Sequence, residues 1–120
     1  MSDFEALAAR YRKFSAERDW EKFHDPRSLI LALVGEVGEL AELYQWPDPK
    51  VQPKPLPNSR LHQRSAEEIS DVLLYLIRLS DVLGIDPVQA ANRKLDAAEE
   101  RFPVDQYLGR APDKSGPSPN

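Results

Sequence analysis

Apolar residues recur every three or four positions along this chain, and no stretch alternates apolar and polar residues convincingly enough for a strand. Ser2 is followed three residues later by Glu5, a capping box that starts a first helix over about residues 3–18. The helix carries an apolar face: Phe4, Leu7, Ala8, Tyr11 and Phe14. The spacing predicts an all-α fold.

A second helix is predicted to begin at Asp25-Pro26, which supplies an N-cap and a first-turn proline. Residues 29–44 then keep helical spacing despite Gly35 and Gly38. The chain is therefore expected to stay helical through this segment.

The third helix follows a loop rich in proline. Five prolines in residues 47–57 predict an extended surface loop that is too short to separate two domains. The helix begins between Ser59 and Ser65. It ends at Gly84, because glycine readily adopts the left-handed conformation that terminates helices.

A fourth helix completes the predicted domain. It opens at Asp86-Pro87 and ends before Pro103. Residues 108–120 are rich in proline, glycine and serine, so we expect a disordered C-terminal tail. The pattern thus predicts one domain over residues 1–107, built from four helices.

The third helix is apolar around nearly its whole circumference. Its apolar residues are Ile69, Val72, Leu73, Leu74, Leu76, Ile77, Leu79, Val82 and Leu83. Such a helix must be surrounded by others, and a chain of 120 residues has few to offer. We therefore expect a homo-oligomer.

Composition narrows the classes of partner. With 16 Lys and Arg against 20 Asp and Glu, the net charge of −4 gives no reason to expect a nucleic-acid polymer. The absence of cysteine excludes disulfides, thiolate metal sites and thiol nucleophiles. No apolar run approaches the ~20 residues that span a bilayer, and the first residues do not resemble a signal peptide. We expect no membrane partner and a cytoplasmic location.

Acidic residues occupy positions where a helical wheel predicts the interior. Glu36 lies in the centre of the second helix's apolar stripe, and Glu39 flanks the stripe one turn on. On the third helix Asp71 lies among apolar and aromatic residues, with Glu68 three positions earlier on the same side. Two inward-facing acidic pairs therefore occur on consecutive helices.

These carboxylates need a compensating positive charge, because buried unpaired charges are costly and four together repel. Arg64 and Arg78 are expected toward the ends or edges of the third helix, away from the acids. Oxygen ligands without cysteine or histidine favour Mg²⁺, or Mn²⁺ in its place, over Zn²⁺. The spacing therefore indicates a magnesium site between the two helices.

Other interpretations compete with a metal site. ExxE is common on exposed helices, and Ser65 with Glu68 matches a capping box if the third helix starts there. A ferritin-like di-iron bundle is disfavoured, since neither His24 nor His62 follows a glutamate at the ExxH spacing. A helical interaction protein without enzymatic activity stays an alternative.

The acidic segments resemble a known family. Glu36-Val37-Gly38-Glu39, followed by Glu68-Ile69-Ser70-Asp71, is similar to the ExxE…ExxD signature of MazG-like nucleotide pyrophosphohydrolases. Within that family the likeness is greatest to the dCTP pyrophosphatase group. The likeness covers roughly residues 11–103 and includes further segments: Glu17-Arg18-Asp19-Trp20, His24, Leu31-Ala32-Leu33-Val34-Gly35, Gln45-Trp46 and Asp71-Val72-Leu73-Leu74-Tyr75-Leu76.

The resemblance implies an all-α four-helix bundle assembled as a dimer or tetramer, with Mg²⁺ held by Glu36, Glu39, Glu68 and Asp71. It also implies hydrolysis of a deoxynucleoside triphosphate, dCTP or a modified dCTP foremost, to the monophosphate and pyrophosphate. A carboxylate not saturated by metal could accept the proton of the attacking water. Glu39 is the first candidate for this role and Glu36 the second.

The resemblance also suggests residues that bind substrate. Lys94 and Arg101 match basic positions that would meet the β and γ phosphates, although an ordinary solvated helix face explains them as well. Trp20, Trp46 and Tyr75 match positions that line a base and sugar pocket, and aromatic faces stack on bases. Trp20 and Tyr75 could instead fill the core. His24 is a further pocket candidate, with a structural histidine as its alternative.

Two positions depart from the family pattern. Ala98 stands where relatives often carry asparagine, and Asn92 on the same helix is a candidate substitute. Tyr11 stands where the dCTP pyrophosphatases have a histidine near the base. Both departures concern the base preference and leave the acidic residues unchanged, and dUTP or phosphoribosyl-ATP pyrophosphohydrolysis on the same fold is the enzymatic alternative.

Overall fold

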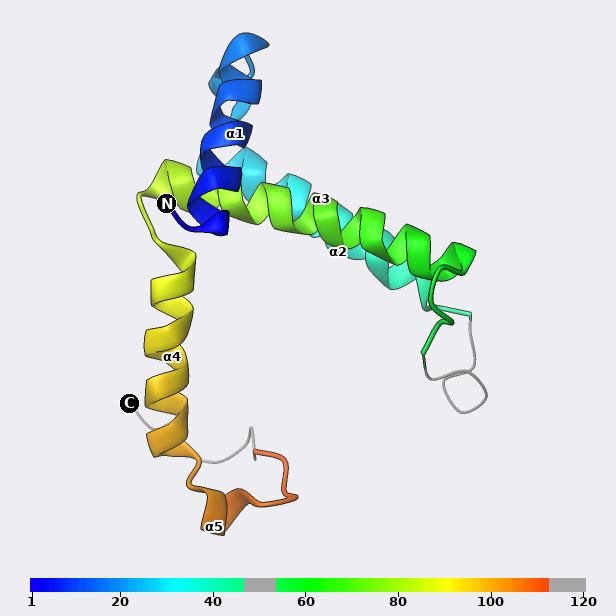
Figure 1. Cartoon of the computed structure of the whole chain (residues 1–120), viewed down its shortest axis with the longest axis vertical. Coiled ribbons are helices and arrows are strands. Elements are labelled where there is room, and N and C mark those ends of the chain that lie inside the picture. Colours follow the sequence, from blue (N-terminus) through cyan, green and yellow to red (C-terminus); the bar gives the residue numbers. More distant parts are fainter. Residues whose placement is uncertain (47–53, 113–120) are drawn as a thin grey trace. The chain divides into compact units, whose positions relative to one another are not determined.

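A computed structural model describes residues 1–46 and 54–112, and every regular element in this part of the chain is helical. The order is α1 (Asp3–Glu17), a 3₁₀ turn η1 (Glu21–Phe23), α2 (Pro26–Leu43), α3 (Arg60–Leu83), α4 (Pro87–Arg101) and α5 (Val104–Tyr107) (Figure 1). The predicted all-α class is confirmed.

The predicted capping residues begin three of the helices. The Ser2 hydroxyl accepts from the Glu5 amide at 3.2 Å, and the Glu5 carboxylate accepts from the Ser2 amide at 3.0 Å. Asp25 caps α2 through the Ser28 amide at 3.0 Å, and Asp86 caps α4 in the same way. Because side-chain caps satisfy amides that lack helical partners, these starts could be predicted from sequence.

The start of α3 settles one of the competing interpretations. Ser59 is the N-cap, and its hydroxyl accepts from the His62 amide at 3.2 Å. Ser65 lies inside the helix, where its hydroxyl donates to the Leu61 carbonyl at 2.7 Å. The capping-box interpretation of Ser65 and Glu68 is therefore wrong, and Glu68 needs another explanation.

Other boundaries agree with the prediction or add to it. Gly84 ends α3 at φ 69°, in the left-handed region that favours glycine. The sequence pattern did not predict η1 or α5, because a single turn is too short to show periodicity. Of the predicted proline loop, residues 47–53 lie outside the described part. Of the predicted tail, residues 108–112 are described and residues 113–120 are not.

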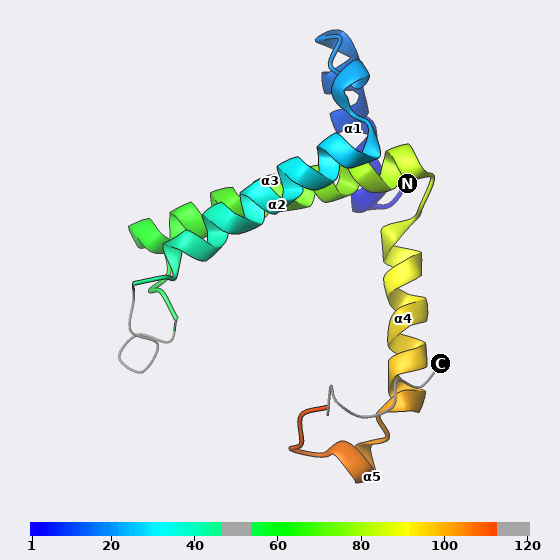
Figure 2. The same cartoon turned by 180° about the vertical axis from the view of Figure 1, so that it is seen from behind.

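The chain forms two compact units, Met1–Ile85 and Asp86–Asn120, each described here by itself. In the first unit α2 and α3 run antiparallel and side by side along their length (Figures 1 and 2), with α1 against α3. In the second unit the ring of Phe102 meets that of Tyr107 edge to face, with centroids 5.1 Å apart. The packing of α4 in a four-helix bundle stays a prediction.

Little of the apolar surface is covered within the first unit. Leu29 and Ile77, between α2 and α3, are the only fully buried apolar side chains in the described residues. The outer face of α2 exposes Ile30, Leu31, Val34 and Val37, and the outer face of α3 exposes Ile69, Leu73, Leu76 and Leu83. None of the described helices combines the length and apolar character needed to cross a membrane.

Candidate metal centre and adjoining pocket

Three of the predicted acidic residues meet in the seam between α2 and α3. Glu36 and Glu39 come from α2 and Glu68 comes from α3. Each offers one carboxylate oxygen, and these oxygens lie within 4.8 Å of one another. The i,i+3 spacing places the two α2 carboxylates on one side of the helix, where antiparallel α3 brings Glu68 beside them. We call these three residues the acidic cluster.

Two oxygens of the acidic cluster are shielded from solvent without compensation. Oε2 of Glu36 and Oε2 of Glu68 are buried, and neither has a hydrogen-bond partner among the described residues. Native proteins rarely leave buried polar atoms unpaired, because each such atom loses its hydration without replacement. The two atoms therefore point to a ligand that supplies positive charge.

Burial and the neighbouring carboxylates make it unfavourable for Glu36 and Glu68 to be ionised together with Glu39. The pKa of Glu36 is raised from 4.5 to about 7. The largest cause is Glu39, with which a protonated Glu36 shares a hydrogen bond, and burial is the next. Burial is also the first cause that raises the pKa of Glu68. A bound cation would reverse this preference by stabilising the charged carboxylates.

Asp71 lies one turn beyond Glu68 on α3 and is half-buried. Its charge is among the causes that raise the pKa of Glu36, so it faces the same seam. Its oxygens are nevertheless not part of the group that lies within 4.8 Å. Three of the four predicted ligands are therefore brought together, and Asp71 stands next to them.

The donor set fits a hard divalent cation. All three groups of the acidic cluster are carboxylates, and two of them carry buried oxygens without a hydrogen-bond partner in the described residues. Mg²⁺ and Mn²⁺ bind carboxylate oxygens and commonly retain open positions for water or phosphate. The three carboxylates could therefore hold a divalent cation, and magnesium as that cation stays a prediction.

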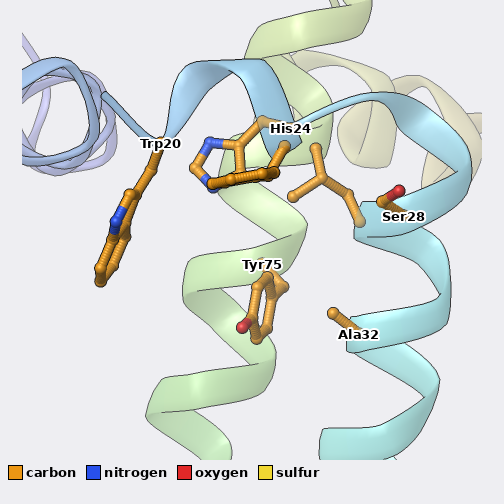
Figure 3. A pocket seen from close by; sticks show the side chains of 7 residues that line it. Trp20, His24, Ser28, Ala32 and Tyr75 are labelled. Atoms are coloured by element: carbon orange, nitrogen blue, oxygen red, sulfur yellow. The ribbon is translucent and has the colours of Figure 1, made fainter. Parts of the chain in front are cut away.

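A pocket of about 380 Å³ lies between the η1 segment, the first half of α2 and α3. Its volume is in the range of sites for small organic ligands. Figure 3 shows around it the side chains of Trp20 and His24, which flank η1, and of Tyr75 on α3. The remaining lining residues are Phe23, Ser28, Leu29 and Ala32.

Helix geometry places this pocket next to the acids. Ala32 precedes Glu36 by four residues on α2, and Tyr75 follows Asp71 by four residues on α3. Residues four apart lie on the same helical face about one turn away from each other. A ligand in the pocket can therefore extend along the seam to the acidic cluster.

A series of hydrogen bonds connects the pocket residue His24 to charged residues on α3 and α1. Arg78 Nε donates to His24 Nδ1 at 2.9 Å, and Arg78 Nη1 lies 2.9 Å from Asp81 Oδ2. Arg12 on α1 binds the same carboxylate with two nitrogens, at 2.6 and 2.9 Å. Burial, and then the Arg78 charge, lower the pKa of His24 below 6.5. The imidazole is therefore neutral near neutral pH.

Arg78 lies toward the C-terminal end of α3, in line with the expectation from the sequence, but it is only 7% exposed. Its burial was not predicted. Its hydrogen-bond partners in the described residues are His24, which follows η1, and Asp81 on α3 itself. The expectation that it does not neutralise the acids agrees with its contacts, which are to Asp81 and His24.

The other pocket candidates differ in placement. The ring of Tyr11 stacks on that of His24, with centroids 6.2 Å apart, so this departure from the family pattern does lie beside the pocket. Trp46 does not line the pocket. Its side chain is 84% exposed, because it follows the C-terminal end of α2 whereas the pocket adjoins the N-terminal half.

The predicted phosphate-binding residues all lie on α4, in the second unit. Lys94 and Arg101 are seven residues apart and share one face of this helix. Asn92 lies roughly 180° around the helix from both. Its substitution for the asparagine missing at Ala98 stays a prediction.

Sequence reasoning missed Arg78, Phe23 and Ser28 as site residues. Phe23 and Ser28 line the pocket from η1 and the first turn of α2, segments that carry no motif by themselves. Arg78 had a detectable signal, since an arginine three residues before Asp81 interrupts an otherwise apolar helix. An i,i+3 ion pair in such a helix indicates a buried polar contact.

Known proteins similar to this chain include one solved structure and several curated sequences. A solved pyrophosphatase from Archaeoglobus fulgidus is 34% identical, with 86% of this chain and 94% of that chain covered and a TM-score of 0.71. dCTP pyrophosphatase 1 of Mus musculus is 46% identical over 112 residues, and that of Homo sapiens is 47% identical over 110. Each comparison covers 89% of this chain, which spans 63% and 62% of the two relatives. No family model matches the chain.

Proposed function

Because the chain belongs to the MazG-like family of nucleotide pyrophosphohydrolases, we propose that it hydrolyses deoxynucleoside triphosphates, dCTP foremost, to the monophosphate and pyrophosphate. The relatives named dCTP pyrophosphatase 1 support dCTP as the first substrate to test. The observation that carries the proposal is the pair of buried oxygens, on Glu36 and Glu68, that have no partner in the described chain.

Glu36, Glu39 and Glu68 would hold the divalent cation, with Asp71 alongside. When bound, Mg²⁺ would offset the charge of the triphosphate and would lower the pKa of the attacking water molecule. Without that positive charge, a triphosphate and the acidic cluster would repel each other. The acidic residues therefore serve as ligands rather than as an interaction surface.

Glu39 is the general base of the proposed reaction. It is the exposed member of the acidic cluster, so a water molecule can reach its carboxylate, whereas Glu36 and Glu68 turn one oxygen each into the protein. Glu39 accepts the proton of the water as its oxygen bonds to the α phosphorus. The bond from that phosphorus to the α–β bridging oxygen breaks, and pyrophosphate leaves.

The base and sugar occupy the pocket between Trp20 and Tyr75. Its lining is mainly apolar and aromatic, which suits stacking against a base. On α2 the pocket residue Ala32 lies about one turn from Glu36, so a base held in the pocket leaves the phosphates near the acids. Lys94 and Arg101, on one face of α4, are the candidates for contact with the β and γ phosphates.

A second copy of the chain covers the outer faces of α2 and α3. Leu31 and Val34 are each 62% exposed, and both outer faces present apolar residues at heptad-like spacing. So much exposed apolar surface beside so small a core indicates an obligate assembly. Sedimentation analysis should find a dimer or tetramer, and Val34→Lys, which introduces a charge on the outer face of α2, should dissociate it.

The decisive experiment is an assay of the purified full chain with dCTP, dUTP, dTTP, dATP and dGTP in the presence of Mg²⁺. Products must be resolved, because monophosphate with pyrophosphate identifies attack at the α phosphorus and diphosphate with phosphate does not. We expect Glu39→Gln and Asp71→Asn to abolish turnover. Glu42→Gln, on the exposed side of α2, is the matched control.

If none of these nucleotides is hydrolysed with either Mg²⁺ or Mn²⁺, the enzymatic proposal is contradicted. The remaining interpretation would then be a helical interaction protein whose acidic residues bind a partner. Turnover that survives Glu39→Gln would instead contradict the assignment of the general base alone.

A further inference from the structure

The imidazole of His24 has two nitrogens with different surroundings. Nδ1 accepts a hydrogen bond from Arg78 Nε at 2.9 Å. No hydrogen bond to Nε2 is found in the described residues. In Figure 3 the ring of His24 lies above the space between Trp20 and Tyr75, so Nε2 borders the interior of the pocket. Nδ1 thus contacts Arg78, whereas Nε2 faces the pocket.

Arg78 can only donate, because a guanidinium has no acceptor. Its hydrogen bond therefore requires an unprotonated Nδ1, and in a neutral imidazole the proton must then be on Nε2. Arg78 is itself held by Asp81, which Arg12 holds in turn. Three charged residues on two helices therefore determine which ring nitrogen carries the proton.

The consequence is a fixed polarity on one wall of the pocket. Nε2–H is a donor and cannot exchange roles with Nδ1 while Arg78 is in place. Pyrimidine bases differ at N3, which accepts a hydrogen bond in cytosine and carries a hydrogen in uracil and thymine. A donor directed at N3 therefore pairs with cytosine, whereas opposite uracil or thymine two donors face each other and both stay unpaired, which is a strong basis for discrimination.

We propose that Arg78 fixes His24 as an obligate hydrogen-bond donor to the base, so that the pocket prefers cytosine nucleotides over those of uracil and thymine. The proposal rests on the proposed function, since it takes the pocket to hold the base. His24 is the specificity-determining residue, and Arg78 is a positioning residue that acts through it.

The first test needs no substrate. His62 is the second of the chain's two histidines and lies exposed at the start of α3, so His62→Gln leaves His24 as the only imidazole. Two-bond proton–nitrogen correlation spectra of this protein, labelled with ¹⁵N-histidine, distinguish a protonated ring nitrogen from a bare one. We expect a neutral ring with Nε2 protonated at about pH 7.5, above the pKa of histidine.

Arg78→Met should change this spectrum, because Nδ1 loses its donor and the neighbouring positive charge disappears. We expect a measurable fraction of the Nδ1–H form or of the imidazolium. A wild-type ring protonated on Nδ1, or a spectrum unaffected by Arg78→Met, would overturn the proposal whatever the enzyme's activity.

The second test measures the ratio of kcat/KM for dCTP to kcat/KM for dUTP. We expect a ratio of about tenfold or more in the wild type, because a missing hydrogen bond in a polar site discriminates strongly. His24→Asn keeps an acceptor near Nδ1 but has no donor at the Nε2 position, so its ratio should fall toward one. His24→Gln places an amide N–H near the Nε2 position and should retain most of the ratio.

His62→Gln is the matched control, and its ratio should equal that of the wild type. Thermal unfolding of each variant shows whether a lost ratio reflects lost folding, and a folded His24→Asn with an unchanged ratio would overturn the proposal. If no nucleotide is hydrolysed, the proposed function fails and the nucleotide is withdrawn as the pocket's ligand, while the imidazole spectrum still reports on Arg78.

Discussion

The two ends of the α2–α3 seam treat buried charge in opposite ways. Near the C-terminal end of α3, Arg78 is almost fully buried but donates to both Asp81 and His24. At the acidic cluster, Glu36 and Glu68 each hold a buried oxygen with no partner in the described chain. The chain therefore completes one set of charges itself and leaves the other incomplete, which is the difference between a structural contact and a ligand site.

The largest expected effect comes from removing the charge of Glu36 in the acidic cluster. Glu36→Gln removes a proposed metal ligand and should lower kcat/KM for dCTP by about 100-fold or more. The same change should raise the urea midpoint of the metal-free protein, because it removes a crowded negative charge. Activity assays with Mg²⁺ and urea unfolding in a chelator measure the two effects.

Glu42→Gln separates this effect from a general loss of charge on α2. Its carboxylate is exposed and lies outside the acidic cluster, so neither activity nor stability should change appreciably. If Glu36→Gln destabilised the metal-free protein, the carboxylate would have a partner within the fold and the contrast between the two ends would fail.

Weakening the contacts among Arg12, Arg78 and Asp81 should lower stability, whereas Glu36→Gln should raise the stability of the metal-free protein. Asp81→Asn weakens the contacts to Arg12 and Arg78 and leaves the buried guanidinium with less compensation. Because the Asp81 side chain is 20% exposed, we expect a loss of about 2 kcal/mol, below that for a fully buried pair. Urea unfolding measures the loss, and a change as small as that of a surface substitution would show that the network contributes little.

The pH dependence of stability should sharpen the contrast. The pKa of Glu36 is about 7 in the folded chain and 4.5 ordinarily. A raised pKa contributes stability that is fully present below pH 4.5 and is lost as the pH rises through about 7. In a chelator, the urea midpoint should therefore fall across this range, and less steeply in Glu36→Gln.

Saturating Mg²⁺ provides the control for this pH series. A bound cation favours the charged carboxylates, so the fall in the urea midpoint should diminish or reverse. An identical pH series in the wild type and in Glu36→Gln, both in chelator, would contradict the assigned pKa.

The smallest effect concerns a neutral contact near the acidic cluster. The Tyr44 hydroxyl lies 2.6 Å from the Ser65 hydroxyl and joins the end of α2 to α3. Tyr44→Phe should cost about 1 kcal/mol in unfolding free energy, the usual contribution of one hydrogen bond. A loss as large as that of Asp81→Asn would mean that the contacts at the two ends of the seam contribute equally to the unfolding free energy.

Sequence predicted the helices well where their ends carry side-chain signals. Ser2, Asp25 and Asp86 are caps that act on amides three residues away, and Gly84 ends α3 through its own backbone. These are local interactions, so a single sequence contains them. The start of α3 stayed open between Ser59 and Ser65, because both serines offer a suitable hydroxyl and only one of them precedes the helix.

The candidate site was predictable in part for the same reason. A carboxylate at the centre of an apolar stripe is visible in the sequence, so Glu36, Glu39, Glu68 and Asp71 could be singled out. Which of their oxygens approach one another depends on the register of α2 against α3. The burial of Arg78 was not predicted, since it depends on α1 and on the segment before α2.

The sequence by itself determined the helical class, the capped ends and the inward placement of the acids, because each depends on residues within one or two turns of one another. Only the tertiary structure decided that three of those acids meet and that Trp20, His24 and Tyr75 form one pocket. It also decided that Arg78 binds a histidine 54 positions away. Contacts between distant segments depend on how helices pack, and helical periodicity reports only which face is turned inward.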